Sequence, residues 1–148
     1  MRIKLAIVFL AFSLGLTAQS KLDSLYGVWQ DQSQEDSTRV GAYKDYIWEG
    51  LIFSNPDSAF KMAEALFTYA VERDYVRAKA HGLYIQGVSF HLRGMYSKAL
   101  TYYQNGSNIY KEISDREGIG NCLNATGLIY LNKANYTKAL FYFTQSLK

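Results

Sequence analysis

Apolar residues recur at helical spacing along most of the chain, and two stretches of this pattern match residue for residue. Residues 83–108 and 123–148 align without a gap, forty positions apart. The identical pairs are Leu83/Leu123, Gly87/Gly127, Tyr96/Tyr136, Lys98/Lys138, Ala99/Ala139, Leu100/Leu140 and Tyr102/Tyr142. A fixed period of this length is typical of helical repeat proteins, in which neighbouring units bury a shared core. No sustained period-two alternation competes with it, so the predicted fold class is all-α.

Capping and turn residues divide the chain into helix pairs. Asn55 precedes Pro56 in a capping position, and we expect Asp74 and Asp115 each to cap the helix that follows. The predicted pairs are 37–53 with 56–73, 74–93 with 96–113, and 115–133 with 136–148. A leader segment with a short helix, 19–36, precedes this repeat domain, 37–148. Its units are about 37–73, 74–113 and 115–148, the last of them incomplete.

Small and aromatic residues hold matching places in the two clearest units. Gly87 and Ala99 are small positions of one pair, and Gly127 and Ala139 repeat them. This pattern resembles the tetratricopeptide repeat in a longer form of about 40 residues. The resemblance implies an α-solenoid of about three antiparallel helix pairs in a right-handed superhelix. The match is weaker in the first unit, where Ile47 replaces the glycine at which the partner helix is expected to approach closely.

The resemblance also implies a concave groove lined by the first helix of each pair. The candidate partner-binding residues are Lys44, Trp48 and Leu51, then His81, Tyr84, Val88 and His91, then Asn121, Asn124, Leu128 and Leu131. Such a mixed surface of aromatic, amide and imidazole groups suits an extended peptide. The alternative is that about half of these side chains only cover the next helix. Because Lys44 is the single fixed cation among them, a clamp for a terminal carboxylate is not expected.

The sequence offers no arrangement for catalysis. His81 and His91 lie ten residues apart on one predicted helix and point about 80° apart at 100° per residue, too divergent for shared metal chelation. Cys122 is the single cysteine, so no internal disulfide forms, and we expect a buried structural thiol. No nucleophile, base and orienting group can be assembled. We therefore predict a protein that is not an enzyme, without metal or cofactor.

The first eighteen residues resemble a secretory signal peptide. Arg2 and Lys4 form a basic start, residues 5–16 are apolar, and Ala18 offers a small residue for cleavage. Leu16 is large for its place in such a site, so an uncleaved anchor is the alternative. Without this segment fourteen basic residues face thirteen acidic ones, a balance that predicts no attraction to nucleic acid or to anionic membrane.

Together these features predict an exported module, periplasmic or extracellular, that binds a protein or peptide. Exported tetratricopeptide arrays resemble the periplasmic input regions of bacterial signalling proteins of the histidine kinase or transcriptional regulator type. The alternative is a stand-alone, self-associating scaffold or an accessory protein of the cell envelope. The last predicted helix has no cap. We expect either that a longer protein continues it or that a partner or second copy covers its apolar face.

Overall fold

The computed structural model describes residues 19–148, so the predicted signal segment lies outside the described residues. The chain divides into two compact units, Met1–Gly50 and Leu51–Lys148. We call them unit 1 and unit 2. Within residues 19–148 the fold is all-helical, without a β-strand, and helices that follow each other in unit 2 pack as neighbours. The predicted all-α class and α-solenoid architecture are confirmed.

The described part of unit 1 contains a helix over residues 19–30, the helix α2 (Asp36–Tyr46) and the start of a π-helical turn, η1 (Ile47–Leu51), whose last residue belongs to unit 2. Trp29 stacks on the buried ring of Tyr43 at 4.2 Å between ring centroids. The Nε of Arg39 donates a hydrogen bond to the Trp29 carbonyl oxygen at 3.0 Å. The predicted single α-helix over 37–53 is wrong in its last part, because α2 ends at Tyr46 and the backbone widens there into the π-helical turn.

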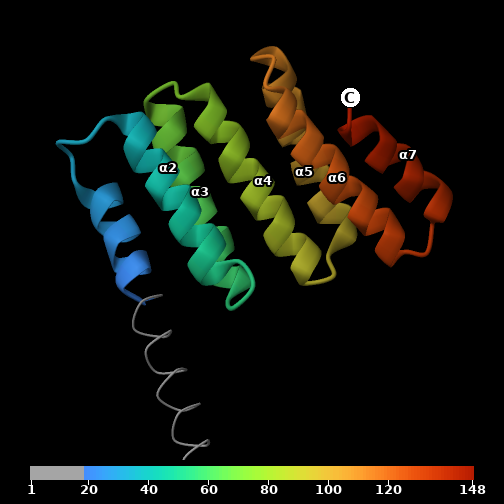
Figure 1. The fold of residues 1–148 in the computed structure, drawn as a ribbon, viewed down its shortest axis with the longest axis horizontal. Helices are drawn as coiled ribbons and strands as arrows, with labels where there is room; N and C mark the ends of the chain where they lie inside the picture. Colours follow the sequence, from blue (N-terminus) through green and yellow to red (C-terminus); the bar gives the residue numbers. More distant parts are fainter. Residues whose placement is uncertain (1–18) are drawn as a thin grey trace, which may run out of the picture. The chain divides into compact units, whose positions relative to one another are not determined.

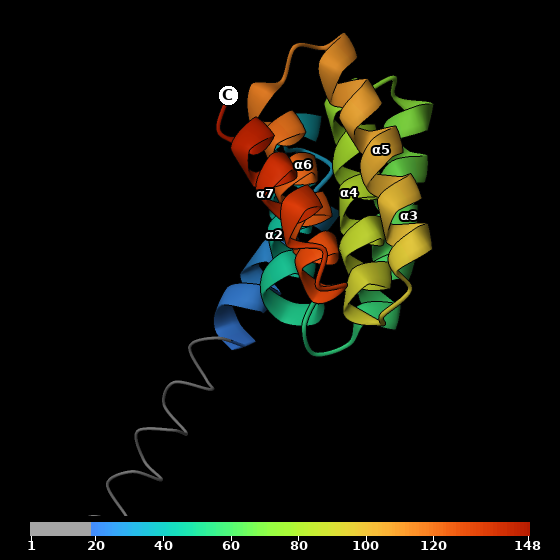
Figure 2. The same cartoon turned by 90° about the vertical axis from the view of Figure 1, so that its right-hand side faces the viewer.

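Unit 2 contains five helices, which Figure 1 shows from green to red. Their bounds are α3 (Pro56–Glu72), α4 (Val76–Leu92), α5 (Tyr96–Glu112), α6 (Arg116–Asn132) and α7 (Tyr136–Ser146). Each helix packs on the next, and α4 also contacts α6. Figure 2 shows α4 beside both α3 and α5. The starts of α3, α5 and α7 are forty residues apart, as are both ends of α4 and α6, so the sequence period is also the structural period.

The four turns of unit 2 share one backbone conformation. Each contains one residue with positive φ: Asp74 at 50°, Gly94 at 72°, Ser114 at 56° and Ala134 at 54°. In each turn the amide of the following residue also bonds back to a carbonyl five positions earlier, for example Asn135 N to Tyr130 O at 2.9 Å. These are Schellman turns, which satisfy carbonyl groups left free at a helix end.

This turn conformation explains one wrong prediction. Asp74 does not cap α4, because it occupies the left-handed position and its carboxylate accepts from Lys79 Nζ at 2.9 Å instead. Asn55 and Asp115 do cap as predicted, accepting from Ser58 N and Gly118 N. The cap residue of α4 is Tyr75, whose side chain makes no capping bond.

The repeated glycines bring neighbouring helices close together, as predicted. A Cβ at Gly87 would lie 2.6 Å from Tyr103 Cε1, and one at Gly127 would lie 2.6 Å from Phe143 Cε1. Both distances are shorter than carbon atoms tolerate, so a side chain at either position would displace an aromatic ring. Ala99 and Ala139 are buried at the corresponding small positions of the partner helices.

Candidate partner-binding surface

Two rows of side chains with the same spacing lie on α4 and α6. We call His81, Tyr84, Val88 and His91 the α4 row, and Asn121, Asn124, Leu128 and Leu131 the α6 row. Within each row the residues lie three, seven and ten positions after the first, so each row occupies one face of its helix. The helices contact each other, and the two rows are related by the forty-residue period.

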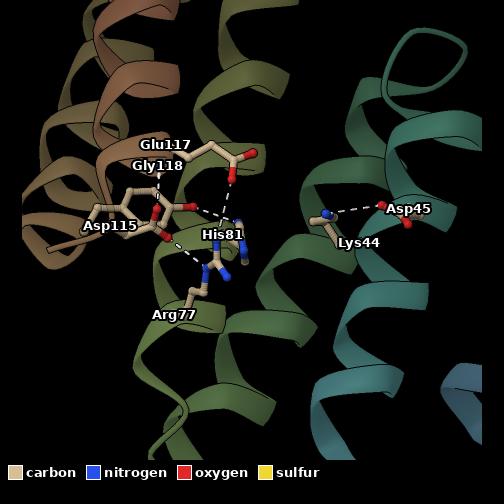
Figure 3. A network of polar contacts seen from close by, with 8 residues as sticks. Lys44, Asp45, Arg77, His81, Asp115, Glu117 and Gly118 are labelled. Carbon is tan, nitrogen blue, oxygen red and sulfur yellow. Dashed lines mark hydrogen bonds and ion pairs between the residues drawn. The ribbon is translucent and has the colours of Figure 1, made fainter. Parts of the chain in front are cut away.

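Ion pairs join α4 and α6 at their N-terminal ends (Figure 3). The Nε of Arg77 lies 2.8 Å from Asp115 Oδ2, and its Nη2 lies 3.7 Å from Glu117 Oε2. The other oxygen of Asp115 accepts from Gly118 N at 3.0 Å, so one carboxylate both caps α6 and holds the guanidinium. This double use fixes the start of α6 relative to α4.

A second connection joins the same helices near their C-terminal ends. His91 Nε2 lies 2.9 Å from Asn132 Nδ2, and His91 Nδ1 lies 3.4 Å from the Tyr103 hydroxyl. Because the amide nitrogen of Asn132 can only donate, Nε2 accepts and the ring is held neutral. Burial lowers the pKa of His91 below its usual value of 6.5, in agreement with a neutral ring. His91 thus links α4, α5 and α6.

The other members of the α4 row also have structural contacts. His81 Nδ1 lies 2.8 Å from the hydroxyl of Tyr110, which is buried. The ring of Tyr84 lies against Tyr103, with 5.8 Å between ring centroids, and burial raises the pKa of Tyr84 to about 12. Val88 is only 8 % exposed, so this predicted groove residue offers a partner almost no surface.

The α6 row is the accessible part of this surface. Asn121 and Asn124 are exposed, and Leu128 and Leu131 keep 40 % and 42 % of their surface exposed. The row is polar toward the start of α6 and apolar toward its end. Large apolar side chains that stay this accessible on a helix packed by three neighbours form a small apolar patch beside two amides.

The remaining predicted residues belong to the N-terminal part of the chain. In unit 1 the Nζ of Lys44 lies 3.3 Å from Asp45 Oδ1, and Trp48 is 38 % exposed. Both lie in unit 1, and Leu51 is the residue at which unit 2 begins. A groove that combines Lys44 and Trp48 with the α4 and α6 rows stays a prediction.

Sequence reasoning missed Arg77 and Asn132, which hold the two ends of the surface together. Arg77 and Glu117 stand forty residues apart and therefore hold the same position in successive repeats. Their opposite charges could have predicted an ion pair between the two repeats. Asn132 had no such signal, because its contact depends on how far α6 extends before its turn. Arg77 pairs with two carboxylates, so this network has no excess positive charge to attract an anionic partner.

Two further observations on the described residues concern metal-binding side chains and the single thiol. Within residues 19–148 no three His, Cys, Asp or Glu side chains gather closely enough to hold a metal ion. Burial raises the pKa of the Cys122 thiol to about 12, which keeps it protonated at neutral pH, as expected for a structural cysteine. No helix in this part of the chain is both long and apolar enough to cross a bilayer.

Comparison with known proteins gives one relative of limited coverage. The uncharacterized protein ycf37 of Guillardia theta is 31% identical over 80 residues, which is 53% of this chain and 44% of that protein. The chain carries a helical repeat fold compatible with the tetratricopeptide type. It spans less than half the length of the relative. No family model matches the chain, and no solved structure matches it.

Proposed function

We propose that unit 2 is a protein-binding module and that the α6 row, beside α4, holds an extended segment of a partner. The observation that carries this proposal is the exposure of Leu128 and Leu131 next to two exposed asparagines. Interaction surfaces commonly combine an apolar contact with side chains able to bond a peptide backbone.

The size of the row sets the length of the bound segment. Asn121 and Leu131 are ten residues apart, a rise of about 15 Å along α6. An extended chain covers about 3.3 Å per residue, so the row contacts roughly four or five residues of a partner. The amides of Asn121 and Asn124 would bond its backbone, and the two leucines would receive apolar side chains.

A displayed library of seven-residue peptides selected against the full chain tests this proposal. We expect selected peptides to carry apolar residues and to bind about tenfold more weakly to the double variant Asn121→Ala, Asn124→Ala. The melting temperature of this variant should stay within about 2 °C of the parent, because both side chains are exposed. Asn105→Ala, at an exposed asparagine of α5, is the matched control. Equal binding to all three proteins would overturn the proposal.

We further propose that the module is a tetratricopeptide-type protein exported by its first eighteen residues. The basic, apolar and small-residue sequence of this segment and the resemblance of the repeat support the proposal. Expression of the full chain in a bacterium, followed by mass spectrometry of the purified protein, tests it. We expect a chain that begins at Gln19 in the periplasmic fraction. An intact chain beginning at Met1 in the cytoplasm would contradict it.

Within this scheme the module is the input part of a longer signalling protein of the histidine kinase or transcriptional regulator type. The support is the resemblance of exported repeat arrays to such input regions. Sequencing the transcript beyond codon 148 tests this assignment. An open frame that leads to a membrane helix and an output domain is expected, and a stop codon would exclude it.

The outer face of α7 favours self-association as a second candidate function. Tyr136 and Leu140 are each 68 % exposed and Phe141 is 57 % exposed, and with Thr137, Thr144 and Gln145 they line a shallow groove of about 510 Å³. This lining contains no charged residue, so two copies can meet there without burying like charges.

Sedimentation velocity at tens of micromolar tests self-association. We expect a dimer for the full chain and a monomer for Leu140→Asp, because one carboxylate per copy would then face its equivalent across the contact. Thr101→Asp, at an exposed position of α5 related to Phe141 by the repeat, is the control. A monomeric parent chain at this concentration would exclude the second candidate.

A further inference from the structure

A cavity of about 240 Å³ lies on the face of α6 opposite the α6 row, between α5, α6 and α7. At 100° per residue, the α6 residues that line it, including Thr126 and Tyr130, point about 165° away from the α6 row. Leu100, Ser107 and Lys111 line it from α5, and Tyr142 lines it from α7. The cavity is thus separate from the proposed peptide surface, and it lies wholly in unit 2.

The internal repeat explains why there is a cavity at this place. Forty residues before Leu100 and Ser107 stand Phe60 and Phe67, at the same positions of α3. In that earlier pair the Phe60 ring lies 5.0 Å from Phe90 and 6.2 Å from Tyr102, measured between ring centroids. The three rings form one cluster.

The later pair keeps two of these three rings. Tyr130 and Tyr142, the equivalents of Phe90 and Tyr102, stack at 5.4 Å and nearly parallel, with 3° between their planes. Leucine stands at position 100, where the third ring would be. A second large residue of the earlier pair, Phe67, packs against Gly82, so that a Cβ at Gly82 would lie 3.0 Å from Phe67 Cβ. In the later pair the small residue Ser107 takes the place of Phe67. The cavity therefore lies beside the place of an aromatic ring that the later pair lacks.

The lining has a basic residue where the earlier pair has an apolar one. Lys111 takes the place of Val71, and the residues around the cavity include no aspartate or glutamate. Among the ion pairs of residues 19–148, none involves Lys111. The hydroxyl of Ser107 lies on the same α5 face as the amide of Gln104, which donates one N–H to Asn108 Oδ1 at 2.8 Å and keeps a second. An anionic group beside the ring site would meet these donors.

The volume limits the ligand to a small molecule. A cavity of roughly 150 Å³ is enough to hold benzene, so 240 Å³ admits one ring with a short substituent. We propose that this cavity binds a single-ring aromatic carboxylate, with the ring beside Tyr130 and Leu100 and the carboxylate at Lys111. Binding is non-covalent.

Titration of the ¹⁵N-labelled full chain with phenylacetate, followed by NMR, tests the proposal. We expect saturable shifts confined to amides of α5, α6 and α7, with a dissociation constant of about 1 mM or below, as for other ligands of about ten heavy atoms. Lys111→Gln should weaken binding about tenfold, and Lys133→Gln, at an exposed lysine outside the cavity, should leave it unchanged. No saturable shift at 10 mM phenylacetate would overturn the proposal.

Two further variants place the ligand within the cavity. Leu100→Phe and Ser107→Phe each restore a ring that the preceding repeat has, and we expect each folded variant to lose phenylacetate binding at least tenfold. Circular dichroism shows which of the two variants folds. If neither does, the loss of binding in Lys111→Gln still tests the proposal. Full binding by a folded Leu100→Phe would overturn the assignment.

Two other ligands define its chemistry. Cyclohexylacetate has the same charge without the aromatic ring, so equal affinity for it would contradict recognition of an aromatic ring. A peptide that ends in phenylalanine with a free carboxylate offers the same chemistry from a protein. If that peptide binds at least tenfold more tightly than phenylacetate, the proposal of a free small-molecule ligand is overturned, and the cavity is a site for a protein C-terminus.

Discussion

The ring of Phe143 lies against the backbone of Gly127 and occupies the space that a side chain there would need. Tyr103 and Gly87 have the same relationship one repeat earlier in the sequence, again with 2.6 Å between the ring and the position of an added Cβ. The two aromatics differ in their freedom to move. Tyr103 is 1 % exposed, whereas Phe143 is only partly buried.

Gly87→Ala should therefore destabilise the protein more than Gly127→Ala. Insertion of a methyl group into a packed core costs about 1–3 kcal/mol, and alanine regains up to about 1 kcal/mol in helix propensity. We expect a net loss of about 1–2 kcal/mol for Gly87→Ala and a smaller loss for Gly127→Ala in urea unfolding. Gly41→Ala, where no atom lies within 4 Å of the new Cβ, should stabilise the protein. A stabilising Gly87→Ala would contradict this packing.

Ala134→Gly should stabilise the protein. Ala134 has a φ of 54°, in the left-handed region that costs a residue with a Cβ about 1 kcal/mol more than glycine. We expect a gain of about 0.5–1 kcal/mol in the free energy of unfolding, measured with urea. Gly94→Ala, at the equivalent turn, should lose a similar amount. If both variants change stability in the same direction, the turns do not share this conformation in solution.

The stability of the parent chain should fall between pH 7.5 and pH 5, in part because of His91. Burial lowers its pKa in the folded state below the usual 6.5, so the unfolded chain binds more protons in this range. Protonation therefore favours unfolding once the pH falls through 6.5. We expect the melting temperature of the parent to drop more than that of His91→Gln over the same interval. An equal drop in the two proteins would contradict this prediction, because it would mean that the pKa of His91 is the same in the folded and the unfolded chain.

Asp115→Ala should cost more stability than Arg77→Ala. The aspartate caps α6 and also pairs with Arg77, whereas the arginine has partly exposed ion pairs alone. Loss of a helix cap costs about 1 kcal/mol, and an exposed ion pair contributes less. Asp115→Asn keeps an acceptor for Gly118 N and should recover most of the loss. Thermal unfolding of the three variants checks this order.

The sequence predicted the helices of unit 2 to within about two residues at each end because glycine, asparagine and aspartate mark their turns. It failed where two local conformations compete for one residue. Asp74 has a side chain suited to capping, but the Schellman turn places it one residue before the cap position of α4, which Tyr75 occupies. Periodicity also could not distinguish a five-residue π-helical turn from the end of α2.

The candidate surface was predicted less completely, because a helical face determines which side chains point together but not which are covered. Val88 shares its face with His91, and yet 92 % of its surface is buried. The links from His91 to Tyr103 and Asn132 join three helices, and no spacing within one helix predicts them.

Within unit 2 each helix contacts mainly the helices that adjoin it in sequence. Native contacts therefore join residues close in sequence, which favours fast folding from several starting points. It also means that the unit need not open all at once. α7 has a single helix as its main neighbour, so its amide hydrogens should exchange with solvent earlier than those of α4, which is held by α3, α5 and α6.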